Sequence, residues 1–426
     1  MELISFCINT ARNELNHVKL LFKSLEQNLS TKQHEILIFI DSDNQGTFEW
    51  LLTQKDVFPN LKILQNHLPI PYGYQRNINE LFKQASHPIV SYLQSDMVVC
   101  KNYDLELLQK IEPNMILCST RIEPPLHGNS GEKITFDFGL DPIGFNLEAF
   151  TQYAESQKSD MLTEYFFAPF TLYKDVWLSI GGHDTQFRRS REDSDVLTRL
   201  VLNGTKIVQT WRALVYHFTC TSSRGPKWFE NNNNEAQTRA KLQQQADQVE
   251  LGRFFQKWGR FLHFTFKSYY YKINAKILGN DLNQNTFYAI QPHFHKVFIE
   301  DKSILSSSEE IFNNKHKIAN TLLNVSDKDW ETYKYMFNHS NSSDVIKHID
   351  ECFGDIIITF NLNDINDMYY QTFILNLQDI IHEIDEEGEF EYGPFHISVK
   401  QKQDQSNENI VVVNPEIKSE HLYKIF

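Results

Sequence analysis

Three short stretches of this chain carry side chains that could do chemistry together. Glu192 and Asp193 are adjacent carboxylates, Asp96 is a further acid, and His217 follows the strand-like run 212–216. An ionised carboxylate can accept a proton from a hydroxyl, and a carboxylate with an imidazole can bind a divalent cation. The set is typical of group transfer from a nucleotide-activated donor, provided that the fold brings these side chains together.

Predicted strands and helices, which must position these side chains, alternate along the chain. Short apolar runs suited to buried strands stand between amphipathic segments whose apolar residues have helical three-and-four spacing. The runs are residues 3–8, 35–40, 61–64 and 89–93, and the helical segments are residues 15–25 and 76–84. This alternation predicts an α/β fold with a mainly parallel sheet flanked by helices. Ligands bind beyond the carboxyl ends of such strands, which makes polar residues there candidates.

Polar side chains follow three of the predicted strands. Thr10, Arg12 and Asn13 follow the first, Asp41 the second, and Ser95 and Asp96 the strand that ends at Leu93. Taken singly, each could be an ordinary turn residue, because Asp, Asn and Ser side chains bond to nearby backbone. Their recurrence at one edge of the sheet favours a ligand site.

Asp193 stands at the start of a predicted helix. Apolar periodicity runs from Val196 to Val201, and Asn203-Gly204 supplies a suitable end. Ser190 and Asp193 also have capping-box spacing, and the helix dipole stabilises an acid there, so a purely structural role is an alternative. The two roles are compatible, because an aspartate kept ionised can serve as a general base.

The order of these motifs resembles the GT-A fold of family 2 glycosyltransferases over roughly the first 260 residues. The matching segments are residues 10–14, 41, 73–77, 94–96, 181–184, 192–195 and 217. The resemblance implies a nucleotide-diphosphate sugar donor, expected to be a UDP-sugar, and a glycan or other hydroxyl acceptor. By the same resemblance, Thr10 and Asp41 hold the base and ribose, and Arg76 lies near the diphosphate, with a helix-surface ion pair as its alternative.

The resemblance also assigns the reacting groups. Asp193 is the expected base of an inverting displacement, and Glu192 contacts acceptor hydroxyls. Asp96 and His217 are the expected ligands of Mn²⁺ or Mg²⁺, although His217 could instead be bonded within a turn. The chain has Gln94-Ser95-Asp96 where such families carry Asp-X-Asp, so one acid is missing. One or two protein ligands can suffice for a cation that bridges phosphates.

Two cations in a Ser- and Gly-rich loop could reach the diphosphate. Arg224 and Lys227 follow Thr221 in this loop, and solvent exposure is the alternative for both. An Arg side chain offers a planar fork of donors to phosphate oxygens. If they bind phosphate, we expect the loop to close over the donor.

Length and charge predict a second domain. The chain has 426 residues, more than one hydrophobic core usually serves. Residues 281–426 contain 25 Asp and Glu against 11 Lys, and no arginine follows Arg260. We expect a transferase domain over residues 1–262, a linker over 263–280 and a smaller acidic α+β domain over 281–426. Its predicted strands are 355–360, 395–399 and 410–413, and its predicted helices are 311–323 and 369–384.

Composition and charge also limit the partners that the chain can bind and the compartment in which we expect it. Neither segment has a net basic excess, which disfavours nucleic-acid binding. No apolar stretch approaches the roughly 18 residues of a membrane span, and the five scattered cysteines fit a reducing compartment. We therefore expect a cytoplasmic protein with no transmembrane segment. The functional alternative is a catalytically inactive GT-A-fold nucleotide- or sugar-binding protein. A nucleotidyltransferase is disfavoured, because no glycine-rich basic loop follows the first strand.

Overall fold

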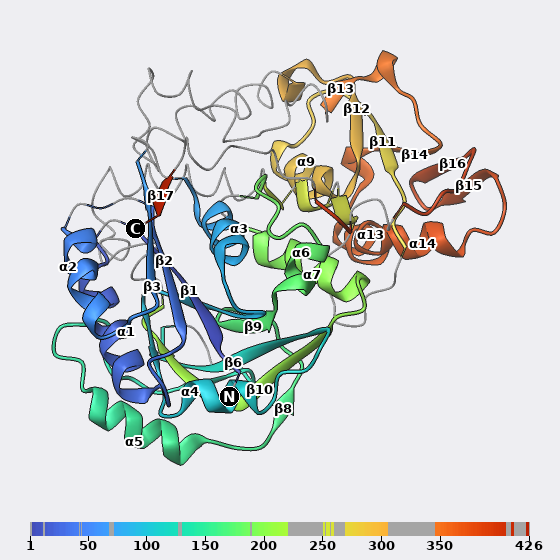
Figure 1. The fold of residues 1–426 in the computed structure, drawn as a ribbon. Coiled ribbons are helices and arrows are strands. Elements are labelled where there is room, and N and C mark those ends of the chain that lie inside the picture. The colour runs from blue at the N-terminus through green and yellow to red at the C-terminus, as the bar shows by residue number, and fades with distance from the viewer. Residues whose placement is uncertain are drawn as a thin grey trace. The chain divides into compact units, whose positions relative to one another are not determined.

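The computed structural model divides the described residues into two compact units. It describes residues 2–11, 13–41, 43, 45–67, 72–126, 130–187, 190–219, 250–251, 253–255, 257–259, 269–305, 346–405, 410–412 and 423–425. The first unit comprises residues 1–185, 203–236 and 412–426, and the second comprises residues 186–202 and 237–411. Figure 1 shows the elements of both units in their chain order.

The first unit is built on one large mixed sheet. Its strands follow the order β17-β3-β2-β1-β4-β9-β6-β10-β5, and β7 and β8 pair with β6 and β10 outside this path. The strands are β1 (Ile4–Thr10), β2 (Glu35–Ile40), β3 (Leu61–Asn66), β4 (Ile89–Gln94), β5 (Met97–Val99), β6 (Met115–Glu123), β7 (Lys133–Thr135), β8 (Leu162–Thr163), β9 (Phe170–Tyr173), β10 (Lys206–His217) and β17 (Tyr423–Ile425).

The pairing brings the carboxyl ends of five strands to one edge. β1 is parallel to both β2 and β4. β6 runs in the same direction as β4, because both pair antiparallel with β9. β10 is parallel to β6. The residues that follow β1, β2, β4, β6 and β10 therefore share the edge where ligands of parallel sheets bind.

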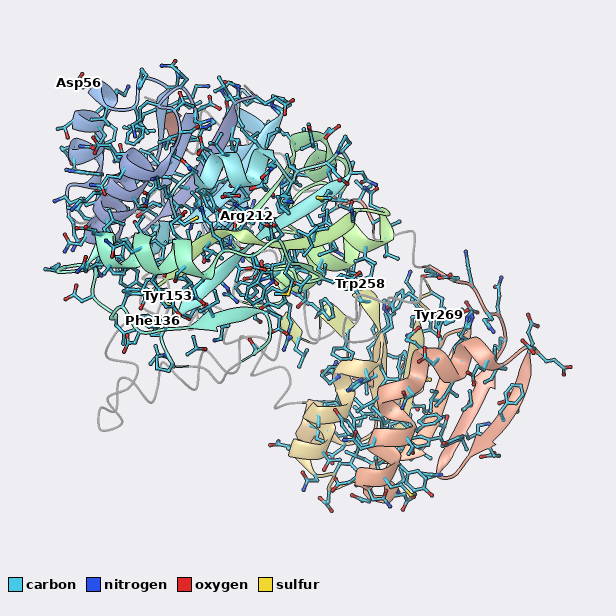
Figure 2. All side chains as sticks on the ribbon, turned by 90° about the horizontal axis from the view of Figure 1, so that it is seen from below. Asp56, Phe136, Tyr153, Arg212, Trp258 and Tyr269 are labelled. Atoms are coloured by element: carbon cyan, nitrogen blue, oxygen red, sulfur yellow. The ribbon has the colours of Figure 1, made fainter. Side chains whose placement is uncertain are left out.

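Helices cover the sheet through their apolar faces. Those of the first unit are α1 (Leu15–Asn28), α2 (Thr47–Thr53), α3 (Tyr74–Gln84), α4 (Tyr103–Leu108), α5 (Leu147–Gln157) and α6 (Lys174–Ser179), with a 3-10 turn at Gln54–Asp56. α1 buries Val18, Leu21, Phe22 and Leu25, the spacing that one helix face requires. In Figure 1, α1 and α2 lie to the left of β1–β3, and α3 lies to their right. Tyr153 of α5 packs on Phe136 with 4.1 Å between ring centroids (Figure 2).

The second unit has a six-stranded sheet of its own, in the order β13-β12-β11-β14-β16-β15. The strands β11 to β14 are parallel, and the hairpin of β15 and β16 adds antiparallel strands at one side. The bounds are β11 (Ile273–Leu278), β12 (Lys296–Ile299), β13 (Ile346–His348), β14 (Ile356–Asn361), β15 (Gly388–Tyr392) and β16 (Phe395–Val399). The helices are α7 (Glu192–Leu202), α9 (Gln284–Ile290), α13 (Asp367–Thr372) and α14 (Leu377–Glu383). The 3-10 turns are Gln291–His293, Ile349–Glu351, Leu362–Asp364 and Ile374–Asn376.

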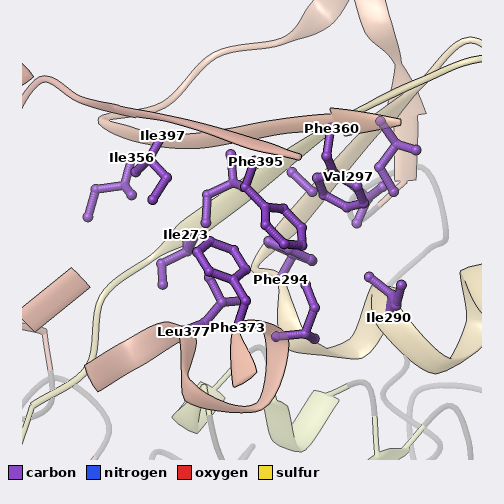
Figure 3. Close-up of a cluster of buried hydrophobic side chains, with 14 of the residues drawn as sticks. Ile273, Ile290, Phe294, Val297, Ile356, Phe360, Phe373, Leu377, Phe395 and Ile397 are labelled. Carbon is purple, nitrogen blue, oxygen red and sulfur yellow. The ribbon is translucent and has the colours of Figure 1, made fainter. Parts of the chain in front are cut away.

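The second unit also has its own hydrophobic core. Figure 3 shows strand residues such as Ile273, Ile356 and Phe360 facing Phe373 and Leu377. Phe373 stacks on Phe395 with 3.9 Å between ring centroids. A separate core of this kind is what distinguishes a domain from an extension of its neighbour.

The predicted fold class is confirmed: an α/β domain with a mainly parallel sheet precedes a smaller domain. Some expected elements differ. Residues 273–278 of the expected linker form β11, which lies between β12 and β14 and buries the apolar residues Ile273, Ala275 and Ile277 in the core of the second unit. Residues 410–412 are irregular rather than a strand, and among the described residues near the C-terminus Tyr423–Ile425 forms β17, which pairs with β3. The predicted helix 311–323 lies outside the described residues.

Of the helices described here, none is both long and apolar enough to cross a lipid bilayer. Cys7, Cys100 and Cys118 are buried free thiols, and Cys352 is a half-buried one.

Candidate functional site

His217 and Asp96 lie side by side at the carboxyl edge of the first sheet. β10 pairs antiparallel with β5, and His217 stands opposite Met97, the residue after Asp96. The Nε2 atom of His217 is 3.8 Å from Oδ1 of Asp96. The backbone N–H of Phe218 donates to the Asp96 carbonyl at 3.1 Å. Sheet pairing thus brings together the two residues expected to bind a cation.

Glu123, the last residue of β6, holds the other side of the imidazole. Its Oε1 atom is 2.8 Å from Nδ1 of His217. Arg121 and Lys133 also pair with this carboxylate, at 3.1 and 2.9 Å. Burial raises the pKa of Glu123, but the bond to His217 and the two cations outweigh it and lower the pKa to about 2. An ionised carboxylate on Nδ1 orients the ring and leaves Nε2 directed toward Asp96.

This donor set fits a divalent cation that takes its other ligands from elsewhere. Asp96 supplies a hard oxygen and His217 a nitrogen, which suits Mn²⁺ as well as Mg²⁺. In the described part of the chain, no group of three or more His, Cys, Asp and Glu side chains is placed to hold a metal ion. The arrangement therefore fits a cation bound jointly with phosphate and water.

Glu14 ties two of the predicted nucleotide-binding residues together. Its Oε2 atom accepts hydrogen bonds from Thr10 Oγ1 at 3.0 Å, Ser95 Oγ at 2.6 Å and the Ala11 N–H at 2.9 Å. Burial, with the nearby charge of Asp96, raises the pKa of Glu14 to about 7. The turn after β1 and the turn that carries Asp96 are therefore joined through one buried carboxyl.

Asp41, at the end of β2, fixes the start of α3. Its carboxylate accepts the N–H groups of Tyr72 at 2.5 Å and Gly73 at 2.9 Å, and Asn66 Nδ2 donates to it at 3.0 Å. Burial raises the pKa of Asp41, although these donors oppose the shift. The sequence predicted a ligand contact here, and the structure shows a carboxylate that also positions the helix carrying Arg76.

Arg76 is buried rather than exposed on the surface of α3. It is 5% exposed, and its guanidinium lies over the ring of Tyr72, 5.8 Å from the ring centroid. Asn13 adopts a left-handed conformation with φ of 66° in the turn after β1. Arg12, Arg224 and Lys227 lie outside the described residues.

Some aromatic residues between 165 and 177 belong to the hydrophobic core, and others contact a residue of the candidate site. Phe170 and Trp177 are buried core residues, stacked with 5.6 Å between ring centroids. Phe167 instead packs under the guanidinium of Arg121, 4.1 Å from its centroid, and Tyr165 accepts a bond from Arg121 at 3.2 Å. These two rings hold the cation that pairs with Glu123, so they support the site indirectly.

The turn before α7 depends on two glycines. Gly181 and Gly182 have φ of 76° and 71°, a region that favours glycine. A Cβ at Gly182 would overlap Asn79, whose side chain bonds both the N–H of His183 at 2.7 Å and its carbonyl at 2.9 Å. Close approach of α3 to this turn therefore excludes any larger residue.

Glu192 and Asp193 occupy the first turn of α7 and are half-buried. The Ser190 N–H donates to Glu250 Oε2 at 2.5 Å, and the Ser190 hydroxyl lies 3.4 Å from the same atom. Ser190 is thus bound to Glu250 in addition to any capping role. Asp193 belongs to the second unit, whereas Asp96 and His217 belong to the first. Their convergence stays a prediction.

Two functional residues were missed in the sequence. Glu123 and Glu14 organise the imidazole and the two turns, respectively. Glu123 ends β6, whose first four residues are apolar, so the rule for strand ends could have found it. Glu14 stood inside the motif 10–14, but nothing in its spacing indicates that Ser95 would reach it.

No family model matches the chain, and no curated protein matches it in sequence. The structure does resemble solved glycosyltransferases. The S. aureus TarS 1–349 complex with UDP aligns over 79% of this chain and 90% of that chain, at 14% identity and a TM-score of 0.39. GalNAc-T7 with UDP, GalNAc and Mn²⁺ aligns over 60% and 48%, at 11% identity and a TM-score of 0.40.

A mannosyltransferase from Pyrobaculum calidifontis, in complex with GDP-Man and Mn²⁺, aligns over 57% of this chain and 63% of that chain. Its identity is 12% and its TM-score 0.38. Because all three TM-scores lie below 0.5, the choice of donor and mechanism depends on the site alone.

Proposed function

We propose that this chain is a divalent-cation-dependent, inverting glycosyltransferase that moves a sugar from a nucleotide-diphosphate donor to an acceptor hydroxyl. The observation that carries this proposal is the Glu123–His217–Asp96 arrangement. One imidazole nitrogen is held by a carboxylate at 2.8 Å, and the other faces a second carboxylate at 3.8 Å. Ordering of this kind is typical of imidazole ligands to metals.

The donor would lie along the same sheet edge. Thr10 and Asp41 would contact the nucleoside, expected to be uridine, with Asn13 and Ser95 nearby in the two turns that Glu14 joins. Arg76 stands on α3, whose start Asp41 fixes, and is proposed to approach the diphosphate. Arg12, Arg224 and Lys227 remain candidates for the same role from the sequence.

The proposed roles of the reacting groups follow from the charges that they carry. Mn²⁺ or Mg²⁺, when bound, supplies Lewis-acid neutralisation of the departing nucleoside diphosphate. Asp193 would accept the proton of the acceptor hydroxyl as its oxygen attacks the anomeric carbon, and the diphosphate would leave from the opposite face. The first turn of α7 favours the ionised form that this role needs. Glu192 would contact acceptor hydroxyls.

The test is turnover with a panel of nucleotide sugars, in Mn²⁺ and in excess EDTA. We expect donor hydrolysis or transfer that requires the cation, is lost in Asp193→Asn and is unchanged in Asp160→Asn, a control at an exposed acid of the first unit. Nucleotide binding without any turnover across donors and acceptors would contradict the proposal. That result would favour a binding protein that keeps the fold without the activity.

A further inference from the structure

Asp195 is a fully buried acid on the helix that carries the proposed base. Its exposed fraction is 0%, and so is that of Arg199, one turn later on α7. Arg199 donates to Oδ2 through Nε at 2.9 Å, and its Nη2 atom lies 2.7 Å from the same oxygen in an ion pair. On its other oxygen, Asp195 is bound by Lys257 Nζ at 2.7 Å and Trp258 Nε1 at 2.9 Å.

These contacts join α7 to the segment 250–258, whose described residues are helical. Trp258 (labelled in Figure 2) is itself fully buried and forms a small apolar cluster with Phe187, Phe254 and Phe255. Both the polar and the apolar contacts therefore attach the same two elements. All of these residues lie within the second unit.

The loop in front of α7 is attached to the same segment. Glu250 accepts the Ser190 N–H at 2.5 Å, and Arg253 Nη1 donates to the Gln186 carbonyl at 2.7 Å. Gln186 and Ser190 on one side of Glu192 and Asp193, and Asp195 on the other, are thus bound to the same segment. These contacts restrain the chain on both sides of the two acids.

Helix geometry explains why Asp195 decides the direction of Asp193. Asp195, Val196, Arg199 and Leu200 are buried, the three-and-four spacing of one face. A residue two positions earlier points to roughly the opposite side of a helix. Because Asp195 is buried against Lys257 and Trp258, Asp193 points away from that core. Asp193 is half-buried.

Asp195 is unsuited to be the base itself. Burial raises its pKa, but Arg199, Lys257 and the Trp258 bond outweigh burial and lower the pKa to about 2. Both of its oxygens are already bonded to donors. A carboxylate in this state is a poor proton acceptor at neutral pH.

We propose that Asp195 is a positioning residue, which together with Lys257 and Trp258 holds Asp193 in the orientation needed for proton removal. The effect of this positioning on catalysis rests on the proposed function, in which Asp193 is the base. The buried carboxylate fixes one rotation of α7, because any other would separate Asp195 from Lys257 and Trp258, its partners on the segment 250–258. The segment 250–258 is therefore part of the machinery that serves the active site.

The test uses the full chain and two variants that leave Asp195 paired with Arg199. Lys257→Met and Trp258→Phe each remove one donor to Asp195. We expect kcat to fall at least about tenfold, because a small misplacement of a catalytic group has a large effect. The KM for the donor and the affinity for UDP with Mn²⁺ should change by less than about twofold. Hydrogen exchange should become faster in residues 186–194 and stay unchanged in β1 to β4.

Asp104→Asn is the matched control. Asp104 is an equally buried carboxylate in the first unit, bonded to His34 and Ser30. It should lower the Tm without changing kcat below the transition or the exchange of residues 186–194. If Lys257→Met and Trp258→Phe lower the Tm like the control, with kcat and this exchange unchanged, the cluster is only structural and the proposal is overturned.

The exchange measurement separates this proposal from the proposed function. Should the wild-type chain show no turnover, the proposed function fails, while faster exchange at residues 186–194 in the two variants still supports the positioning contact. Normal turnover in Asp193→Asn would overturn the catalytic part of both proposals. Unchanged exchange in both variants would overturn the positioning role whatever the activity.

Discussion

The Nε2 atom of His217 lies 3.8 Å from Oδ1 of Asp96, although the two residues come from distant parts of the chain. The antiparallel register of β10 on β5 sets this approach, because it places His217 opposite Met97. Glu123 on Nδ1 then fixes which nitrogen faces the acid. The two proposed metal ligands are thus brought together by strand pairing, and one buried carboxylate orients the imidazole.

We expect His217→Gln to weaken cation-dependent nucleotide binding at least about tenfold, because it removes the imidazole ligand. Titration of Mn²⁺ into the chain with UDP, followed by calorimetry, measures this. His34→Gln is the control, since His34 is also buried and bonded to a carboxylate, Asp104, at 2.8 Å. Equal Mn²⁺ affinity in wild type and His217→Gln would remove His217 from the site.

Glu123→Gln should lower the affinity for Mn²⁺ by about 10- to 100-fold, the usual effect of losing the partner of a ligating histidine. The amide is neutral and no longer favours the tautomer that leaves Nε2 free for a cation. The same titration detects the change. Glu106→Gln is the control, because Glu106 is another buried acid paired with Arg212 and Lys158. A similar loss in both variants would point to general destabilisation.

Glu14→Gln should flatten the dependence of stability on pH between 5 and 8. Burial raises the folded-state pKa of Glu14 to about 7, above its ordinary value of 4.5. Its contribution is therefore full below pH 4.5 and is lost as pH rises through 7. Urea unfolding at pH 5 and pH 8 should show the wild type losing roughly 2 kcal/mol more than the variant. Equal losses of unfolding free energy in the wild type and the variant would mean that Glu14 is ionised at neutral pH.

Asp41→Asn should destabilise the chain by about 1–3 kcal/mol, because an amide N–H₂ would face the N–H of Tyr72 or Gly73. UDP affinity should fall as well, since the start of α3 loosens. Thermal unfolding and UDP titration give the two results. Asp56→Asn, at an exposed acid labelled in Figure 2, is the control and should leave both unchanged. Normal UDP affinity in a folded Asp41→Asn variant would exclude Asp41 from the nucleotide site.

Gly182→Ala should be more destabilising than Gly204→Ala by about 1–3 kcal/mol, the cost of forcing atoms into a packed interior. The two glycines have nearly equal φ, 71° and 73°, so the backbone strain of a side chain is matched. They differ in surroundings: a Cβ at Gly182 meets Asn79 and Trp177, whereas nothing lies within 4 Å of one at Gly204. Chemical unfolding compares them. Equal losses would show that Asn79 can move aside.

The sequence alone predicted several local elements of the first unit. The apolar run 35–40 and the spacing of Leu15 to Leu25 predicted β2 and α1, because burial of one face imposes a period that the residues record directly. The rule for strand ends likewise placed Asp96 near the edge where His217 ends β10. These inferences need only local periodicity and the direction of parallel strands.

Only the tertiary structure showed what each of those side chains is bonded to. Glu14 reaches Ser95 across the sheet, Glu123 reaches His217, and Asp195 reaches Trp258, all pairs far apart in the chain. Spacing cannot reveal such pairs, because hydrogen bonding and charge pairing depend on which strands and helices become neighbours. The residue types fixed what chemistry was available, and the three-dimensional packing decided which groups hold the others in place.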